Sequence, residues 1–165
     1  MNRGRFVAFV VVASVILAST ALAQTPATSR FATTYQKWIS EDVVYIATPE
    51  ERAQFLGLTN DQDRLSFIVQ FWEKRNPNPG KTENTYKKEE HYRRLAYSNE
   101  HFADDRLPGW KTDRGRVYIV YGPPDEKKYV APPPHRAEIW YYNSGKQFRF
   151  VDECDCGQYQ VQGLQ

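Results

Sequence analysis

The segment that most constrains the fold is residues 109–125, where turn-forming residues stand at both ends of a short alternating run. Glycine, proline and aspartate favour tight turns, each through a different backbone effect. The residues of the two corners are Gly109, Trp110, Thr112, Asp113, Arg114, Gly115 and Arg116 at the first, and Gly122, Pro123, Pro124 and Asp125 at the second. Between the corners, Val117, Ile119 and Tyr121 alternate with other side chains, which predicts a strand over residues 116–121.

The rest of the chain predicts helices followed by strands. The expected helices cover residues 31–40, 48–57, a third segment that Thr59 or Asn60 caps and that runs through Trp72, and residues 84–102. The expected strands cover residues 116–121, 127–130, 137–142, 146–151 and 159–161. Segregated helices and strands indicate an α+β fold, with N-terminal helices packed on a small C-terminal antiparallel β-meander. Residues 31–165 are expected to form one domain.

Two of the helices carry specific signals. Thr48, Pro49 and Glu51 match a capping box with proline in the first helical turn. In the third helix an apolar stripe is expected at Leu65, Ile68, Val69 and Trp72, and Phe67 with Phe71 widens it. The helix over residues 84–102 is rich in charge, and most of its surface is expected to face solvent.

The N-terminus has the features of a secretory signal peptide. Arg3 and Arg5 precede a nearly apolar stretch, and Ala21 and Ala23 supply the small residues that signal peptidase requires. We expect cleavage after Ala23, a disordered lead-in over residues 24–30, and a periplasmic or secreted product. A retained anchor is the alternative, but the apolar stretch is shorter than the roughly 20 residues that span a bilayer. No later segment of the sequence is long and apolar enough for a span.

Charge argues against a nucleic-acid partner. The whole chain has 22 Lys and Arg against 20 Asp and Glu, and the predicted signal peptide contains two of the basic residues and no acidic one. The mature chain is therefore neutral when histidine is uncharged. Affinity for nucleic acid comes mainly from neutralising phosphates, so a neutral domain is not expected to bind it.

Longer sequence blocks point to a family. Residues 109–113 read Gly-Trp-Lys-Thr-Asp, and the pentapeptide resembles the signature of the GWxTD domain, a family of exported bacterial proteins without an assigned reaction. Further blocks that resemble the family lie at residues 42–51, 71–77, 89–94, 115–125 and 138–142. The resemblance covers essentially the whole mature chain. It implies export, and it implies no specific chemistry.

The two corner aspartates are the candidate catalytic acids. Asp113 or Asp125, assisted by Arg114 or Arg116, would suit a small extracytoplasmic hydrolase. The alternative favoured by the local sequence is structural: Asp113 accepts the backbone N–H of Gly115 in an Asx-turn. Arg116 is also a candidate centre of a buried ion-pair hub between the two aspartates, from which removal of one member costs about 3–5 kcal/mol.

A second candidate surface is one face of the predicted sheet. With Val117, Ile119, Ile139, Tyr141, Phe148 and Phe150 placed toward the helices, the opposite face displays aromatic and charged side chains. The residues of this possible binding face are Tyr118, Glu138, Trp140, Tyr142 and Arg149, together with Arg116. Aromatic and arginine side chains are frequent in binding hot spots. The alternative is that another helix, such as residues 31–40, covers this face.

The remaining chemically active residues predict little. Cys154 and Cys156 are separated by one residue, so a local turn disulfide, free thiols, or metal or redox chemistry all remain open. Two thiols do not complete a zinc site. Glu89, Glu90 and His91 lack the spacing that stacks metal ligands on one helix face, which favours a solvated helix surface. No metal or cofactor is predicted.

The sequence therefore favours a non-catalytic binding module. Its expected partner is a protein or an envelope polymer of the extracytoplasmic space, and its expected contact surface is the sheet face. A small hydrolase that uses Asp113 or Asp125 is the alternative function.

Overall fold

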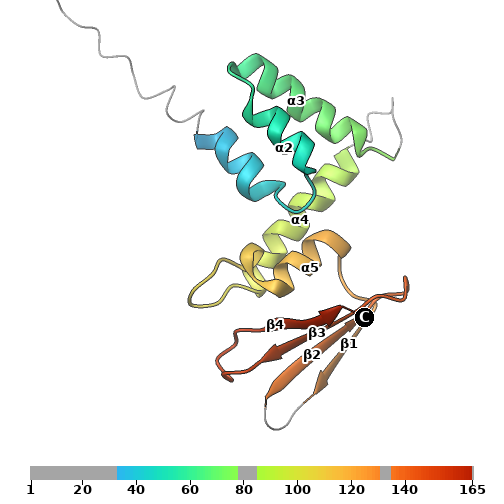
Figure 1. Ribbon diagram of the computed structural model, residues 1–165. Coiled ribbons are helices and arrows are strands. Elements are labelled where there is room, and N and C mark those ends of the chain that lie inside the picture. The colour runs from blue at the N-terminus through green and yellow to red at the C-terminus, as the bar shows by residue number, and fades with distance from the viewer. Residues whose placement is uncertain (1–32, 78–84, 131–134, 165) are drawn as a thin grey trace, which may run out of the picture.

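The computed structural model describes residues 33–77, 85–130 and 135–164. The predicted signal peptide and lead-in, residues 1–30, lie outside these ranges. Figure 1 shows a helical half above a half built from helix and sheet, with one long helix running through both. Helices precede strands along the chain, so the α+β prediction is confirmed. No helix among the described residues is both long and apolar enough to cross a membrane.

The helical half contains three helical segments before the long helix. A helix from residue 33 ends in a π-helical turn, η1 (Trp38–Asp42), and is followed by α2 (Pro49–Leu56) and α3 (Asp61–Lys74). The predicted capping box of α2 is confirmed: Thr48 Oγ1 accepts the Glu51 N–H at 3.2 Å, and Glu51 Oε2 accepts the Thr48 N–H at 3.1 Å. Asn60 is the residue that caps α3, because its Oδ1 accepts the Asp63 N–H at 2.9 Å.

The first core is an aromatic cluster between these helices. Its buried members are Tyr35, Trp38, Ile39, Val43, Phe55, Phe67, Phe71 and Trp72. Trp38 lies at its centre, with its ring centroid 4.8 Å from that of Phe55 and 5.1 Å from that of Phe71. The predicted stripe on α3 was wrong for Leu65 and Val69, which are exposed, and it is confirmed for Trp72 and for the widening residues Phe67 and Phe71, which are buried. Their larger apolar area decides which face of the helix turns inward.

The long helix α4 (Thr85–His101) joins the two halves. Tyr92 packs against the first core, and Tyr97 packs against the second. His91 and Ser98 are buried although most of the helix is polar. The prediction of a mainly solvent-facing helix was therefore wrong for the surface that carries these two residues. Both side chains contact backbone carbonyl groups: His91 Nε2 lies 2.6 Å from that of Asp42, and the Ser98 hydroxyl donates to that of Gly115 at 3.5 Å.

Residues 116–121 are helical, which corrects the predicted strand. α5 (Asp113–Tyr121) begins after Thr112, whose Oγ1 accepts the Gly115 N–H at 3.1 Å, and it ends at Gly122 with φ of +85°. Val117 and Ile119 are both buried. These residues are two positions apart, so they lie on different sides of the helix. Both are buried because α5 lies between α4 and the sheet and is covered on more than one side (Figure 1). This double burial mimics the alternation of a strand.

The sheet is the predicted antiparallel meander without its first expected strand. It consists of β1 (Glu126–Val130), β2 (Arg136–Tyr141), β3 (Gln147–Asp152) and β4 (Gln160–Leu164), in the order β1-β2-β3-β4. Trp140 pairs with Phe148, and Glu138 pairs with Phe150. Paired residues share a face, so these four side chains point to the same side of the sheet.

The second core lies on that side. Phe102, Val117, Trp140, Phe148 and Phe150 form it, with Tyr97, Tyr118 and Tyr142 packed at its margin. The predicted facing of β3 was right, but the facing of β2 was inverted. Ile139 pairs with Arg149 on the outer face, and Trp140 points toward the helices. Side chains alternate along a strand, so an error of one residue exchanges the faces.

Candidate binding site at the junction of the two halves

The first corner is a point of close backbone contact. Gly109 opens a short 3-10 turn, η3 (Gly109–Lys111), against α4. A Cβ atom at Gly109 would lie 1.7 Å from the Ser98 carbonyl oxygen, and one at Gly115 would lie 1.8 Å from the Gly109 carbonyl oxygen. Only glycine fits at both positions, because real Cβ atoms do not approach so closely. These two glycines therefore fix the separation of α4, η3 and α5.

Polar contacts complete this corner. Thr112 Oγ1 donates to the Gly109 carbonyl at 2.8 Å while it accepts the Gly115 N–H. Asp113 Oδ2 accepts the backbone N–H of Val161 on β4 at 2.8 Å. The predicted Asx-turn from Asp113 to Gly115 was wrong, because the threonine hydroxyl takes that N–H and the aspartate anchors the last strand instead.

Trp110 links the corner to the first half of the molecule. Its backbone N–H donates to Asn99 Oδ1 at 3.0 Å, and its carbonyl accepts the Tyr45 hydroxyl at 3.1 Å. The rings of Tyr45 and Trp110 lie 6.3 Å apart, centroid to centroid.

The second corner is occupied by its own neighbours. Asp125 Oδ2 accepts the Asn143 N–H at 2.7 Å, and Oδ1 accepts the Asn143 side-chain amide at 2.7 Å. Pro123 and Pro124 lie in the turn between α5 and β1. Arg116 Nη2 lies 2.8 Å from Asp113 Oδ1, and the side chain is 45% exposed. The predicted hub with both aspartates does not form, because among the described residues Arg116 pairs with Asp113 alone.

Arg114 is directed into the sheet. Its Nη1 lies 3.3 Å from Glu138 Oε2, and its guanidinium carbon lies 4.0 Å from the Tyr159 ring centroid. Glu138 is buried and also faces Lys127 at 3.9 Å. This ion pair joins α5 to β2 on the side of the sheet that was predicted as the binding face.

The predicted binding face is not an open surface. Trp140 is fully buried, and Tyr118 stacks on Tyr97 of α4 with ring centroids 4.5 Å apart. Tyr142 donates its hydroxyl to the Gly122 carbonyl at 2.9 Å, and burial raises its pKa. Arg149 is exposed, but it lies on the opposite side of the sheet. Helices α4 and α5 cover the face, rather than the residue 31–40 helix considered as its cover.

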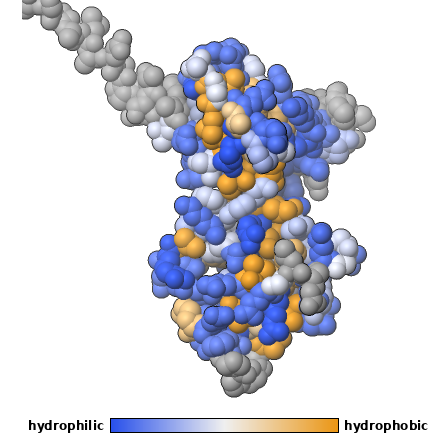
Figure 2. Space-filling view, in the orientation of Figure 1, coloured by the Kyte–Doolittle hydropathy of each residue, from blue (hydrophilic) through white to orange (hydrophobic). Residues whose placement is uncertain are grey.

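The structure instead places a cavity of about 340 Å³ where the two halves meet. It is bounded by α3, α4, the end of α5 and the turn that precedes α2. The lining residues are Ile46, Trp72, Arg75, Lys87, Glu90, His91, Arg94, Ile119 and Val120. Figure 2 shows the molecule's surface in the orientation of Figure 1, with apolar residues lying among hydrophilic ones over both halves.

Arg75 forms a fixed part of the cavity wall. Its guanidinium donates to both carboxylate oxygens of Glu51, at 2.6 and 3.0 Å, and to the Ile46 carbonyl at 2.7 Å. It also lies 3.5 Å from the Phe71 ring centroid. The hydrogen bonds from Arg75 lower the pKa of Glu51 against the opposing effect of burial. This bidentate pair is held by several contacts and is internally neutral.

Arg94 connects the cavity to the second corner. Its Nε donates to Glu90 Oε1 at 2.7 Å, and its Nη1 lies 3.4 Å from the carbonyl oxygens of Ile119 and Val120. A Cβ atom at Gly122 would lie 2.8 Å from Arg94 Nη2. Burial opposes ionisation of Glu90, yet hydrogen bonds from Arg94 and Arg93 keep its pKa below the ordinary value.

His91 is a neutral, buried member of the wall. Its Nε2 lies 2.6 Å from the Asp42 carbonyl oxygen, and its ring centroid lies 5.4 Å from that of Trp72. Burial lowers the pKa of His91. A neutral ring with a carbonyl beside Nε2 carries its proton on Nε2, which leaves Nδ1 as a hydrogen-bond acceptor. The predicted solvated surface was wrong for this residue.

Counted over the residues that the structure describes, the cavity therefore has one cation in excess. Arg75 is balanced by Glu51 and Arg94 by Glu90, whereas exposed Lys87 has no ion pair among the described residues. The lining residues include no serine, threonine or cysteine. A partly apolar cavity with a few convergent polar groups is typical of a ligand site. Its charge suits an anionic group.

The comparisons with known proteins identify the family. The sequence model of the GWxTD domain matches residues 17–155, most of the chain. The chain belongs to the GWxTD domain family. A search of curated proteins found no match, and a search of solved structures found none either.

The family match includes both corners and every residue that lines the cavity. In this GWxTD domain the matched region ends before β4, yet Asp113 of the signature binds the backbone of β4. No sequence pattern predicted the cavity, because the residues that line it come from separate parts of the chain. Two family-like blocks, residues 71–77 and 89–94, supply Trp72, Arg75, Glu90, His91 and Arg94. The resemblance of both blocks to the family is the sequence feature that these five cavity residues share.

Proposed function

We propose that this GWxTD domain is a non-catalytic binding module, and that the junction cavity receives an anionic group of a partner protein or envelope polymer. The observation that carries the proposal is Lys87, which has no ion pair among the described residues, at a cavity whose other cations are already paired. Because Arg75 and Arg94 are held by carboxylates and carbonyls, they shape the site, and Lys87 supplies the net attraction for the ligand.

The arrangement of the wall supports recognition rather than a reaction. Trp72 and Ile119 offer apolar surface, and neutral His91 offers an acceptor nitrogen beside the cationic groups. Such a mixture orients a ligand through a few polar contacts and shields them from water. The glycine corners serve this function indirectly, because they set the spacing of α4 and α5 and thereby the width of the cavity.

The hydrolase alternative is less well supported. Each oxygen of Asp113 and of Asp125 already has a hydrogen-bond donor within the protein. A general base must instead reach a proton of the substrate or of an attacking water. Neither aspartate lines the junction cavity.

We also propose that the module acts outside the cytoplasm, in the periplasm or the secreted fraction. The signal-peptide features of residues 1–23 support this location. A disulfide between Cys154 and Cys156 is consistent with it, because disulfides persist mainly in oxidising compartments. Mass spectrometry of the exported protein tests the proposal: a first residue at Gln24 supports it, and an intact N-terminus recovered from the cytoplasm contradicts it.

The binding proposal is tested with two adjacent lysines of α4. Lys87 lines the cavity, whereas Lys88 is exposed and does not. Calorimetric titration at low salt would use a tetraglutamate peptide and an oligogalacturonate as anionic probes. We expect Lys87→Glu to weaken binding of at least one probe at least tenfold, and Lys88→Glu to change it less than twofold. Equal weakening by the two variants would show non-specific charge attraction, and failure of both probes to bind would contradict the anionic-ligand proposal.

A further inference from the structure

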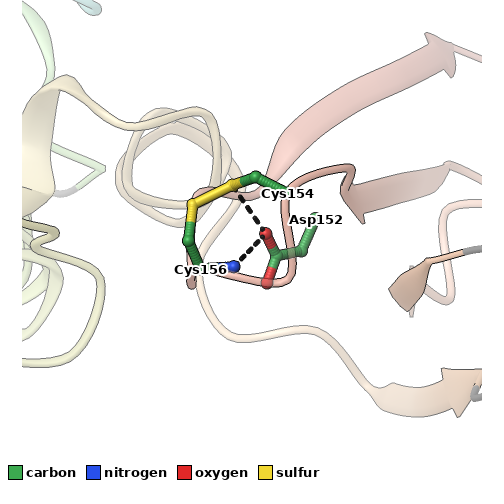
Figure 3. Close-up of side chains that lie close together, drawn as sticks. All are labelled: Asp152, Cys154 and Cys156. Carbon is green, nitrogen blue, oxygen red and sulfur yellow. Dashed lines mark hydrogen bonds between the residues drawn. A yellow bond between two sulfur atoms is a disulfide. The ribbon is translucent and has the colours of Figure 1, made fainter.

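The loop between β3 and β4 carries a disulfide in an unusual position. Cys154 and Cys156 are bonded although only one residue separates them, and both are exposed to solvent. Figure 3 shows the bridge beside the carboxylate of Asp152, whose oxygen lies between Cys154 Sγ and the backbone nitrogen of Cys156. An exposed bridge is open to attack by an external thiolate.

The loop is held in place by Asp152 and does not depend on the bridge. Asp152 is fully buried, and its carboxylate accepts the N–H of Cys156 at 3.1 Å and of Gly157 at 2.8 Å. Arg136 Nη2 lies 3.3 Å from Asp152 Oδ2. These contacts involve no sulfur, so they remain when the bridge opens. The two cysteines then stay close together and can reclose.

Stabilisation of the fold does not explain the bridge. A disulfide stabilises a protein mainly by restricting the unfolded chain, and the effect grows with the length of the loop that it closes. A bridge across a single intervening residue closes nearly the shortest loop available. The β3–β4 pairing and the Asp152 contacts already define this part of the chain.

Asp152 makes the two sulfurs chemically different. Its Oδ1 lies 3.4 Å from Cys154 Sγ. When the pair is reduced, the Cys154 thiol can donate to this oxygen. When the pair is oxidised, the negative carboxylate repels an incoming thiolate from Cys154 and leaves Cys156 as the favoured point of attack.

We propose that Cys154 and Cys156 form a thiol–disulfide exchange site that accepts two electrons from an accessible dithiol of another protein. This inference is independent of the junction cavity and of any ligand bound there.

The exchange proceeds in two balanced steps. A substrate thiolate attacks Cys156 Sγ and forms a mixed disulfide, while Cys154 Sγ leaves with the electron pair of the broken bond. The proton lost by the substrate thiol returns through water to Cys154, whose S–H then donates to Asp152. The second substrate thiol loses its proton and attacks the first substrate sulfur. Cys156 leaves and is protonated, so the substrate gains a disulfide and the pair becomes a dithiol.

A metal centre is the competing use of the same residues. Asp152, Cys154 and Cys156 are the one group of three close potential ligands within the described ranges. In the oxidised protein the cysteines are bonded to each other, and the carboxylate of Asp152 is already engaged by two N–H groups and Arg136. These engagements leave it poorly placed as a third metal ligand, which favours the redox use.

The first experiment measures exchange in the wild-type protein. The mature protein is incubated under native conditions with a reduced dithiol peptide, and free thiols are counted by alkylation and mass spectrometry. We expect two protein thiols to appear as the peptide disulfide forms, and the pair to equilibrate across ordinary glutathione ratios. A bridge that stays oxidised both with the dithiol peptide and across the glutathione ratios would overturn the proposal. Zinc retained by the reduced protein after desalting would overturn it in favour of a metal centre.

The second experiment tests the asymmetry between the cysteines. Cys154→Ser retains the attacked sulfur, and Cys156→Ser retains the sulfur beside the carboxylate. In these variants the remaining thiolate attacks oxidised glutathione, and we expect Cys156 of the Cys154→Ser protein to form the mixed disulfide at least fivefold faster than Cys154 of the Cys156→Ser protein, because the carboxylate disfavours the Cys154 thiolate. Asp152→Asn in each background should reduce the difference, and Asp155→Asn, which alters an acid of the same loop, should preserve it. Equal rates for the two cysteine variants would contradict the assigned roles, even if the Asp152 variants do not fold.

Discussion

The two halves of the molecule reach stability in different ways. The helical half is a cluster of aromatic side chains whose helices are close in sequence and carry their own caps. The half with the sheet depends on contacts between distant segments: Gly109 against α4, Asp113 against β4, and Arg114 against Glu138 of β2. An apolar core tolerates hydrophobic substitutions, because other side chains of similar volume can fill the same space. A close backbone contact at a glycine does not tolerate substitution, because an added Cβ atom would overlap the neighbouring backbone.

The difference suggests a division of labour. The first half presents Trp72, Arg75 and Ile46 to the junction cavity, and the glycine corners of the second half bring Ile119 and Val120 opposite them. The close backbone contacts at the glycine corners are therefore needed to form the cavity. Four substitutions test whether the two halves differ in this way.

The largest effect is expected at the signature glycine. Gly109→Ala places a Cβ atom where the Ser98 carbonyl lies, at 1.7 Å, so α4 and η3 must separate. We expect a loss of more than about 4 kcal/mol in the free energy of unfolding, measured by denaturant titration. Gly57→Ala is the control, because its nearest contact would be an ordinary 3.5 Å. A loss at Gly109 no larger than that at Gly57 would remove the basis of the comparison.

The next effect concerns the inverted face of β2. Trp140 is fully buried in the second core, and Tyr141 points to the outer face. Trp140→Ala should cost about 3–5 kcal/mol through the lost burial and the cavity left behind, and Tyr141→Ala should cost much less. Thermal unfolding followed by near-ultraviolet circular dichroism measures both. If Trp140→Ala leaves stability unchanged and weakens binding instead, the face is a recognition surface after all.

A pH effect is expected where the two halves meet. Burial lowers the pKa of His91 in the folded protein, so between that value and the ordinary value near 6.5 the unfolded chain binds more protons. The contribution of neutral His91 to the free energy of unfolding is thus fully present above pH ~6.5, and it decreases as the pH falls toward the lowered pKa. The slope approaches roughly 1.4 kcal/mol per pH unit at most.

Urea titrations at several pH values measure this dependence. His91→Gln should reduce the slope, whereas His101→Gln, which alters an exposed ring on the same helix, should leave it unchanged. An identical slope in the wild-type and His91→Gln proteins would show that other groups control the acid sensitivity.

The smallest effect is expected at a helix cap in the first half. Thr48→Ala removes the acceptor for the Glu51 N–H and breaks the capping box of α2. We expect a loss of about 1 kcal/mol in the free energy of unfolding. Thr48→Ser, which retains the hydroxyl, should recover most of it. A loss comparable to that of Gly109→Ala would mean that the helical half is as intolerant of local change as the corners.

Sequence reasoning succeeded where a structure follows from neighbouring residues. The capping box at Thr48 was predicted because its partners are three residues apart, and the β-meander was predicted from alternation and intervening turns. The family was indicated by the pentapeptide and confirmed by the match over residues 17–155. The predicted export and binding activity remain proposals.

Sequence reasoning failed where burial comes from more than one side. Val117 and Ile119 resemble one face of a strand, but they lie on a helix enclosed by α4 and the sheet. The Asp113 carboxylate was expected to bind a neighbour two residues away, and it binds Val161 instead. The cavity residues come from α3, α4, α5 and the turn before α2, so no local pattern joins them.

The sequence by itself determined the α+β class, the helix caps, the order of the meander and the membership of a family, because these depend on short-range backbone preferences and residue patterns. The tertiary structure alone decided which face of β2 is buried, that residues 116–121 are helical, and where the junction cavity lies. Those properties depend on contacts between segments far apart in the chain, and the free energy of such contacts exceeds the local preferences that they override.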